Sequence, residues 1–260
     1  MAQLRSNRVK QKLQAGEVAL VVGLNDADAI EALGPVGLVD GVWIETEHGA
    51  VTWRELSDLA RAADLAGVSS LVRVMNATPS LIGRTLDRGV QGVIVPHCVS
   101  AEHARAVVEG ALYTPKGKRG MYSPTRQGLG VPNYFRIAND ELFVMVLIED
   151  LEAIEHLDEI LAVPGIDCFF VAPYDLAQTM GEQYIGQPHH ADVRALTEAT
   201  IKRVLAVGRT AGTVVNGDNV EHYAAMGVRF FLTSLNEFAM MGLRGFRTRL
   251  AAAVTSQKKS

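Results

Sequence analysis

Short apolar runs rich in β-branched residues alternate along the chain with segments of helical periodicity. The runs have the length of buried strands, and the segments between them repeat apolar residues every three or four positions. In the segment 52–67, the apolar side chains fall near one face and Gly67 is placed to end the helix. The eight candidate strands are residues 18–24, 41–45, 70–74, 92–96, 142–149, 167–173, 210–216 and 229–234.

Strands that are apolar throughout and separated by helices are typical of a parallel sheet buried on both faces. Eight such units in 260 residues favour a closed (β/α)₈ barrel over an open, doubly wound sheet, because a barrel of this kind takes about 250 residues. We therefore predict a single α/β domain, a TIM barrel, over residues 1–260.

One connection, residues 113–140, is unusually long and rich in Gly, Pro and basic residues. A loop of this length in a compact domain is usually functional or disordered. We expect it between the fourth and fifth strands, either at the helix-to-strand end of the unit or over the barrel mouth. Its basic run 117–120 is a candidate clamp for an acidic substrate, although a solvated loop is the commoner outcome.

Composition excludes several classes of function. The chain is 48% hydrophobic and 21% charged, and its net charge of −4 gives no reason to expect a nucleic acid or an anionic membrane as partner. The two cysteines are too few and too scattered for a disulfide framework or a zinc site. No stretch approaches the roughly 18 uninterrupted apolar residues of a membrane-spanning helix. We predict a cytoplasmic protein.

Polar side chains follow the ends of seven of the eight candidate strands. In a TIM barrel the carboxyl ends of the strands meet at one face, and the active site lies there. The residues concerned are Glu45, Glu47, His48, Arg73, His97, Glu149, Asp150, Asp175, Asn216, Asp218 and Ser234.

Glu149 and Asp175 follow neighbouring strands, so a barrel places them close together. Two carboxylates without Cys or His ligands suit a hard cation such as Mg²⁺, and zinc is disfavoured. The alternative is structural: Glu149 with Asp150, and Asp175 separately, can cap the helices that follow them. Spacing alone leaves both interpretations open.

Arg73 lies inside an apolar strand, where an unpaired guanidinium is costly. It either forms a structural ion pair with a glutamate of the second strand or faces an anion at the mouth. His48 directly follows two acids, which favours an acid–base role over a buried histidine that bonds a backbone carbonyl. His97 and His103 are interpreted as structural. No glycine-rich phosphate-binding motif follows any strand.

The motifs "ETEHG", "VRV", "YTPKGKRG", "LIED" and "VAPYDLA" occur in an order that resembles the HpcH/HpaI family of metal-dependent, class II pyruvate aldolases. The resemblance runs from about Gly23 to Phe246. Members of the family include 4-hydroxy-2-oxoheptanedioate aldolase and 2-dehydro-3-deoxyglucarate aldolase. The resemblance implies a TIM barrel of the phosphoenolpyruvate/pyruvate type and a homo-oligomer, usually a hexamer, in which the C-terminal helix contacts a neighbour.

The resemblance also implies roles for single residues. Glu149 and Asp175 fall on the metal ligands, for Mg²⁺ or Mn²⁺ with Co²⁺ as a further option. Arg73 falls on the arginine that stabilises the enolate oxygen. His48 falls on the histidine that acts with a bound water as the acid–base group, and Glu47 on the glutamate before it.

Further positions concern the substrates. The backbone that receives the pyruvate carboxylate falls on Ala172 to Asp175, with Ala172 and Pro173 as the substrate-binding residues. Arg119 falls on a loop that reaches into an active site and influences the second substrate. Three positions depart from the family: Glu45 replaces an Asp that orients the histidine, Leu147 replaces a Gln near pyruvate, and Ala172 replaces a Gly.

The expected function is that of a carbon–carbon lyase that cleaves or forms 4-hydroxy-2-keto acids, with pyruvate and an aldehyde as partners, in aromatic or sugar-acid catabolism. No lysine stands at a strand end, which argues against Schiff-base chemistry. Two alternatives remain: an oxaloacetate decarboxylase of the macrophomate synthase type, and a barrel that binds a keto acid without turnover.

Overall fold

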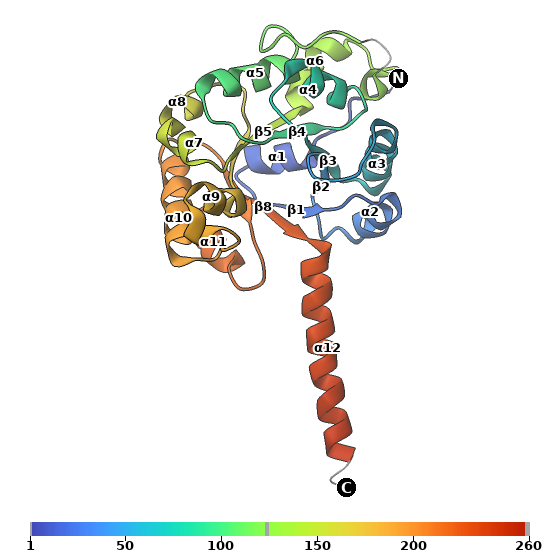
Figure 1. Ribbon diagram of the computed structural model, residues 1–260. Helices are drawn as coiled ribbons and strands as arrows, with labels where there is room; N and C mark the ends of the chain where they lie inside the picture. The colour runs from blue at the N-terminus through green and yellow to red at the C-terminus, as the bar shows by residue number, and fades with distance from the viewer. Residues whose placement is uncertain (1, 123–124, 258–260) are drawn as a thin grey trace.

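The computed structural model describes residues 2–122 and 125–257, which form a closed barrel of parallel strands (Figure 1). Each strand pairs with its neighbours in sequence, and β1 closes the barrel against β8. The strands are β1 (Ala19–Gly23), β2 (Gly41–Glu45), β3 (Ser69–Arg73), β4 (Gly92–Val95), β5 (Phe143–Ile148), β6 (Cys168–Val171), β7 (Ala211–Val214) and β8 (Phe230–Ser234). The predicted TIM barrel and its eight strands are confirmed.

Helices cover the outside of the barrel. They are α2 (Ala27–Leu33), α3 (Trp53–Ala66), α4 (Pro79–Leu86), α5 (Ala101–Ala111), α6 (Tyr134–Glu141), α7 (Leu151–Glu155), α8 (Leu157–Leu161), α9 (Pro173–Thr179), α10 (Ala191–Ala206) and α11 (Val220–Met226). Helix α3 shows why the sequence predicted them well. Thr52 and Glu55 cap its first turn reciprocally, and Gly67 ends it with a φ of 70°.

Side chains that point into the barrel form layers, and the layer at the carboxyl end is polar. Leu71 of β3 and Met145 and Leu147 of β5 belong to one buried cluster inside the barrel. Side chains alternate between the two faces of a strand, so the next inward positions are Arg73 after Leu71 and Glu149 after Leu147. Because residues two apart on a strand share a face, Arg73 and Glu149 both point inward at the barrel mouth.

The amino-terminal end of the barrel is closed by α1 (Arg8–Gln14). Val9 of this helix joins the cluster inside the barrel. The Lys10 ammonium donates to the carbonyl of Leu142, 2.5 Å away, and pairs with Asp167 at 3.3 Å. Leu142 and Asp167 immediately precede β5 and β6, so α1 covers the ends at which the strands begin.

The long connection after α5 differs from the loop predicted over residues 113–140. Its last part, Tyr134–Glu141, is helix α6, which buries Tyr134 and Ala138. The amide of Gln127 donates to the carbonyls of Gly89 and Val90, just before β4. The connection thus packs at the amino-terminal side of the barrel, at the helix-to-strand end of the unit.

The last helix, α12 (Leu235–Gln257), leaves the end of β8 and projects away from the barrel (Figure 1). At about 1.5 Å per residue, its 23 residues extend about 34 Å. Large apolar side chains along it are exposed to solvent in the single chain. They include Phe238, Met240, Met241, Leu243, Phe246, Leu250 and Val254.

Within the part of the chain that the structure describes, no helix is both long and apolar enough to cross a membrane. The cytoplasmic location expected from the sequence stays a prediction. Cys98 and Cys168 are both free and buried.

Candidate active site

A cavity of about 800 Å³ opens at the carboxyl ends of the strands. Glu45, Arg73 and Glu149 line it from three strand ends, and Asp175 lines it from the first turn of α9. The apolar part of its wall comes from the barrel interior: Trp43, Leu147, Phe170, Val214 and Leu232. A polar rim over an apolar interior is the usual form of a small-molecule site.

Glu149 is the most deeply buried carboxylate of the site, with only 1% of its surface exposed. Its Oε1 accepts a hydrogen bond of 2.9 Å from the backbone N–H of His97, whereas Oε2 has no hydrogen-bond partner. Burial raises the pKa of Glu149 to about 7, and the charge of Asp175 adds to that effect. A buried oxygen without a protein partner is free to accept a bond from water or to bind a cation.

The residues present fit a divalent cation. Glu149 and Asp175 lie close enough for one charge to raise the pKa of the other, and both line the same cavity. Neither caps a helix: α9 begins at Pro173 with Ala172 as its N-cap, and α7 begins after Asp150. In the described residues no group of three or more His, Cys, Asp and Glu is arranged to hold a metal. Two carboxylates with water and substrate oxygens suit Mg²⁺ or Mn²⁺ rather than zinc.

Arg73 both forms ion pairs with glutamates at the end of the second strand and faces the cavity, so the two alternatives left open by the sequence are not exclusive. Its Nε lies 2.6 Å from Oε2 of Glu45, and its Nη1 lies 3.1 Å from Oε2 of Glu47. The strand register pairs Glu45 with Arg73 directly across β2 and β3. The guanidinium is also part of the cavity wall and lies over the Trp43 ring at 5.8 Å. Arg73 is therefore a fixed positive charge that faces the cavity.

The structure corrects the role expected for Glu45. Its Oε1 accepts hydrogen bonds from the backbone N–H groups of Glu47 (2.7 Å) and His48 (3.1 Å), and its Oε2 bonds Arg73 and Trp43. The ring of His48 instead lies near Glu47, with Nε2 3.8 Å from Oε2. This carboxylate therefore holds the backbone of the loop after β2. Glu45 thus bonds the backbone of the loop that carries His48, whereas the His48 ring lies near Glu47.

His48 lies at the rim of the cavity with 68% of its side chain exposed. This exposure excludes the alternative of a buried core histidine. Glu47 beside it is largely buried, and burial raises its pKa although the charges of Arg73, His48 and His97 oppose the shift.

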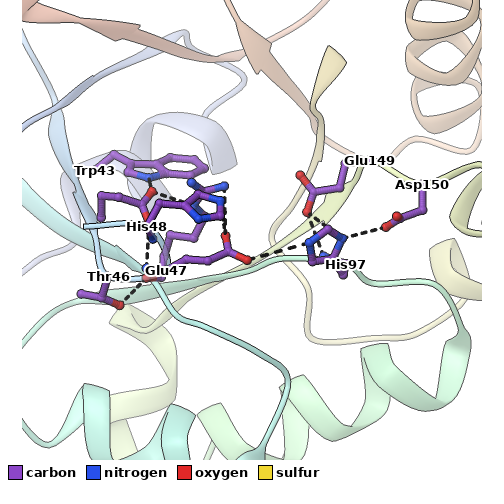
Figure 2. Close-up of polar contacts among 9 residues, drawn as sticks. Trp43, Thr46, Glu47, His48, His97, Glu149 and Asp150 are labelled. Carbon is purple, nitrogen blue, oxygen red and sulfur yellow. Dashed lines mark hydrogen bonds and ion pairs between the residues drawn. The ribbon is translucent and has the colours of Figure 1, made fainter. Parts of the chain in front are cut away.

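His97, which the sequence led us to treat as structural, lies within the carboxylate cluster. Figure 2 shows its ring between Glu47 on one side and Glu149 and Asp150 on the other. Nδ1 lies 3.1 Å from Oδ2 of Asp150. Burial lowers the pKa of His97, but the bond to Asp150 and the surrounding carboxylates outweigh it and leave the pKa raised.

The backbone explains how His97 reaches Glu149. Its φ of 52° is a left-handed conformation that non-glycine residues rarely adopt. This conformation accompanies the backbone N–H donation to Glu149. The position of His97 at a strand end was the one feature of the sequence that pointed to the site. Its left-handed backbone conformation cannot be read from the sequence.

The remaining predicted residues divide into two groups. Leu147 and Ala172 line the cavity, and Pro173 is the first residue of α9 beside it. The structure differs from the expectation that Arg119 reaches into an active site, because its side chain is buried against the outer helices. Its Nη2 lies 2.7 Å from Oδ1 of Asp87, and its guanidinium stacks on Tyr113. These contacts hold the Arg119 side chain away from the cavity of its own chain, which it does not line.

The barrel and the carboxylate, guanidinium and imidazole groups at its mouth define a TIM-barrel enzyme with its site at the carboxyl ends of the strands. The family follows from comparison of the whole sequence. A model described as HpcH/HpaI aldolase/citrate lyase matches residues 18–240, and the chain belongs to this family.

Several relatives span nearly the same length. A pyruvate aldolase of Rhizobium etli is 38% identical over 214 residues, which cover 81% of this chain and 83% of the relative. A 2-keto-3-deoxy-L-rhamnonate aldolase of Escherichia coli is 32% identical over 235 residues, or 88% of this chain and 87% of the relative. The crystal structure of an HpcH/HpaI aldolase from Desulfitobacterium hafniense has a TM-score of 0.83 and 30% identity, and the match covers 94% of this chain and 96% of that one.

The burial of Glu149 predicts a pH-dependent stability of the metal-free protein. The folded protein holds a proton on this carboxyl up to about pH 7, whereas the unfolded chain releases it near 4.5. The free energy of unfolding should therefore fall between pH 4.5 and 7, by up to roughly 3 kcal/mol from this group. Urea denaturation across this range in EDTA measures the slope.

The variant Glu149→Gln should remove this contribution, so its metal-free stability should fall less between pH 4.5 and 7 than that of the parent. Glu152→Gln, an exposed carboxylate on α7, is the matched control and should keep the parent slope. Equal slopes for the parent and Glu149→Gln would contradict the assignment of Glu149 as a desolvated acid.

Proposed function

We propose that this chain is a class II aldolase that requires a divalent metal and cleaves or forms 4-hydroxy-2-keto acids, with pyruvate as the nucleophilic partner. The observation that carries the proposal is the buried Glu149, whose unpartnered Oε2 lies in the same cavity as Asp175, Arg73 and His48. The names of two relatives, a pyruvate aldolase and a keto-deoxy sugar-acid aldolase, support the same chemistry.

Glu149 and Asp175 would hold Mg²⁺ or Mn²⁺, with Co²⁺ as a further option. When bound, a divalent cation polarises the keto group of pyruvate as a Lewis acid. Two carboxylates leave coordination positions for oxygens of water and of the keto acid.

Arg73 supplies a second positive charge. Its ion pairs with Glu45 and Glu47 fix the guanidinium before substrate arrives, so little reorganisation is needed. We assign it to the keto oxygen of pyruvate, which gains negative charge when a methyl proton leaves.

His48 is the proposed acid–base group, because its exposed imidazole lines the cavity beside Glu47. His97 is held by Asp150 and lines a smaller neighbouring cavity. In the synthetic direction one proton leaves the pyruvate methyl group, a new C–C bond joins that carbon to the aldehyde carbon, and the aldehyde oxygen takes a proton. Cleavage reverses these steps, and His48 transfers the proton at the hydroxyl.

The keto-acid carboxylate is assigned to the start of α9. Ala172 lines the cavity there, but Pro173 has no N–H to donate. The donors in this segment would be the backbone N–H groups of Tyr174 and Asp175. Leu147, where the family usually has Gln, provides an apolar wall beside them.

The proposal predicts metal-dependent release of pyruvate from a 2-keto-3-deoxy sugar acid, measured with a coupled dehydrogenase. EDTA should abolish turnover and Mn²⁺ should restore it. Because His48 transfers the proton, His48→Asn should lower kcat by about 10² to 10⁴-fold. His97→Asn is the matched control: it also replaces an imidazole, tolerates the left-handed backbone, and should lower kcat much less.

Full turnover in EDTA, or in Glu149→Ala, would contradict the metal-dependent mechanism. A larger loss in His97→Asn than in His48→Asn would move the acid–base role to His97. Oxaloacetate decarboxylation is followed in parallel, since decarboxylation faster than aldol cleavage would identify the alternative reaction.

We also propose that the protein is a homo-oligomer, a hexamer by resemblance to the family, in which α12 packs against a neighbouring subunit. The support is the set of large apolar side chains that α12 exposes in the single chain. Monomeric proteins rarely expose contiguous apolar surface of this kind.

Disruption of this apolar surface should yield smaller species. Leu243→Glu combined with Phe246→Glu should reduce the mass measured by light scattering towards 28.1 kDa, because buried glutamates would be desolvated in the contact. Arg247→Gln on the same helix is the control and should leave the mass unchanged. A monomeric parent protein would contradict the proposal.

A further inference from the structure

We propose that the aldehyde partner of this enzyme is a neutral hydroxyaldehyde rather than one that carries a carboxylate, phosphate or sulfonate. The inference rests on the proposed aldolase function and adds the class of the second substrate. Its basis is the balance of charges and hydrogen-bonding groups in the wall of the cavity.

The cavity wall carries more negative than positive charge. Among the described residues that line it, Glu45, Glu149, Asp175 and Glu237 supply carboxylates. Arg73 is the one guanidinium or ammonium group among these described lining residues, and His48 and His189 add two imidazoles. Arg73 is already engaged by Glu45 and by Glu47 behind it. A divalent cation between Glu149 and Asp175 would offset those two charges, and the carboxylate of pyruvate would add another negative one.

We assign the aldehyde to the part of the wall that is formed by the ends of β7 and β8 and the start of α12. It contains Asn216, Asn219, Ser234, Asn236 and Glu237. These are amides, a hydroxyl and a carboxylate. The side-chain carbonyls of Asn216 and Asn219 accept backbone N–H groups at 2.9 Å, so their amide NH₂ groups are the donors that remain.

Glu237 favours a neutral aldehyde over an anionic one. In the described chain its carboxylate has no cationic partner within 4 Å, and it stands in the first turn of α12 at the cavity. An anionic group brought here would lose hydration without gaining a cation from this chain, and would face a like charge. Hydroxyl groups instead can donate to Glu237 and accept from the asparagine amides.

The consequence concerns the substrate in the cleavage direction. Its single charge would be the 2-keto-acid carboxylate, and the remainder of the molecule would carry hydroxyl groups. This pattern matches a 2-keto-3-deoxy sugar acid and disfavours a dicarboxylate such as 4-hydroxy-2-oxoheptanedioate.

The test uses the Mn²⁺-loaded enzyme, pyruvate and two acceptors of equal length: 4-hydroxybutanal, which is neutral, and succinic semialdehyde, which ends in a carboxylate. We expect kcat/KM to be at least about tenfold higher for the neutral aldehyde. Glu237→Lys should shift the ratio at least about tenfold towards the anionic aldehyde. Glu221→Lys, which makes the same charge change on α11 outside the cavity, is the control and should leave the ratio unchanged.

Equal or higher kcat/KM for succinic semialdehyde in the parent enzyme would overturn the inference. Exchange of the pyruvate methyl protons in D₂O, followed by NMR, separates this result from failure of the proposed function. If the methyl protons exchange but pyruvate adds to no neutral aldehyde, the proposed class of aldehyde is wrong and the aldolase function still stands. Absence of exchange in the loaded enzyme would overturn the aldolase function and this inference with it.

Discussion

The two-residue repeat of a parallel strand determines where this chain places its charges. Leu71 and Leu147 fill the barrel interior, and the next inward positions of the same strands are Arg73 and Glu149. Barrel closure then brings strand ends that are far apart in sequence to one rim. The amino-terminal end is closed by α1, so these side chains meet at the one end of the barrel where the structure describes a large cavity. The site is therefore a continuation of the core packing.

This arrangement carries an energetic cost. Glu149 is almost fully buried with one oxygen unpartnered, and its pKa is raised to about 7. A buried carboxylate of this kind destabilises the protein unless a proton or a cation joins it. For Arg73 this cost is offset, because Glu45 and Glu47 pair with it. The contrast between a paired arginine and an unpaired glutamate is the physical reason to assign cation binding to Glu149.

The sequence predicted the barrel well because its strands are apolar throughout and its helices carry local stop signals such as Gly67. Predictions that depended on distant partners were weaker. The basic residue Arg119 pairs with Asp87, which no local pattern indicates. The carboxylate of Glu45 holds backbone N–H groups instead of the His48 ring, and His97 reaches Glu149 through a left-handed backbone. Helix α6 was hidden within a segment rich in Gly and Pro. Burial, register and backbone dihedrals decide these cases, and they arise only from the folded chain.

The central claim is that Glu149 and Asp175 together bind one divalent cation. The most direct measurement is titration of the purified protein with Mn²⁺ at pH 7.5, in which the free ion is followed by electron paramagnetic resonance. The account predicts one ion bound per chain, with binding lost in Glu149→Gln and in Asp175→Asn and retained in Glu152→Gln. Mn²⁺ binding of parent affinity in both Glu149→Gln and Asp175→Asn would contradict it.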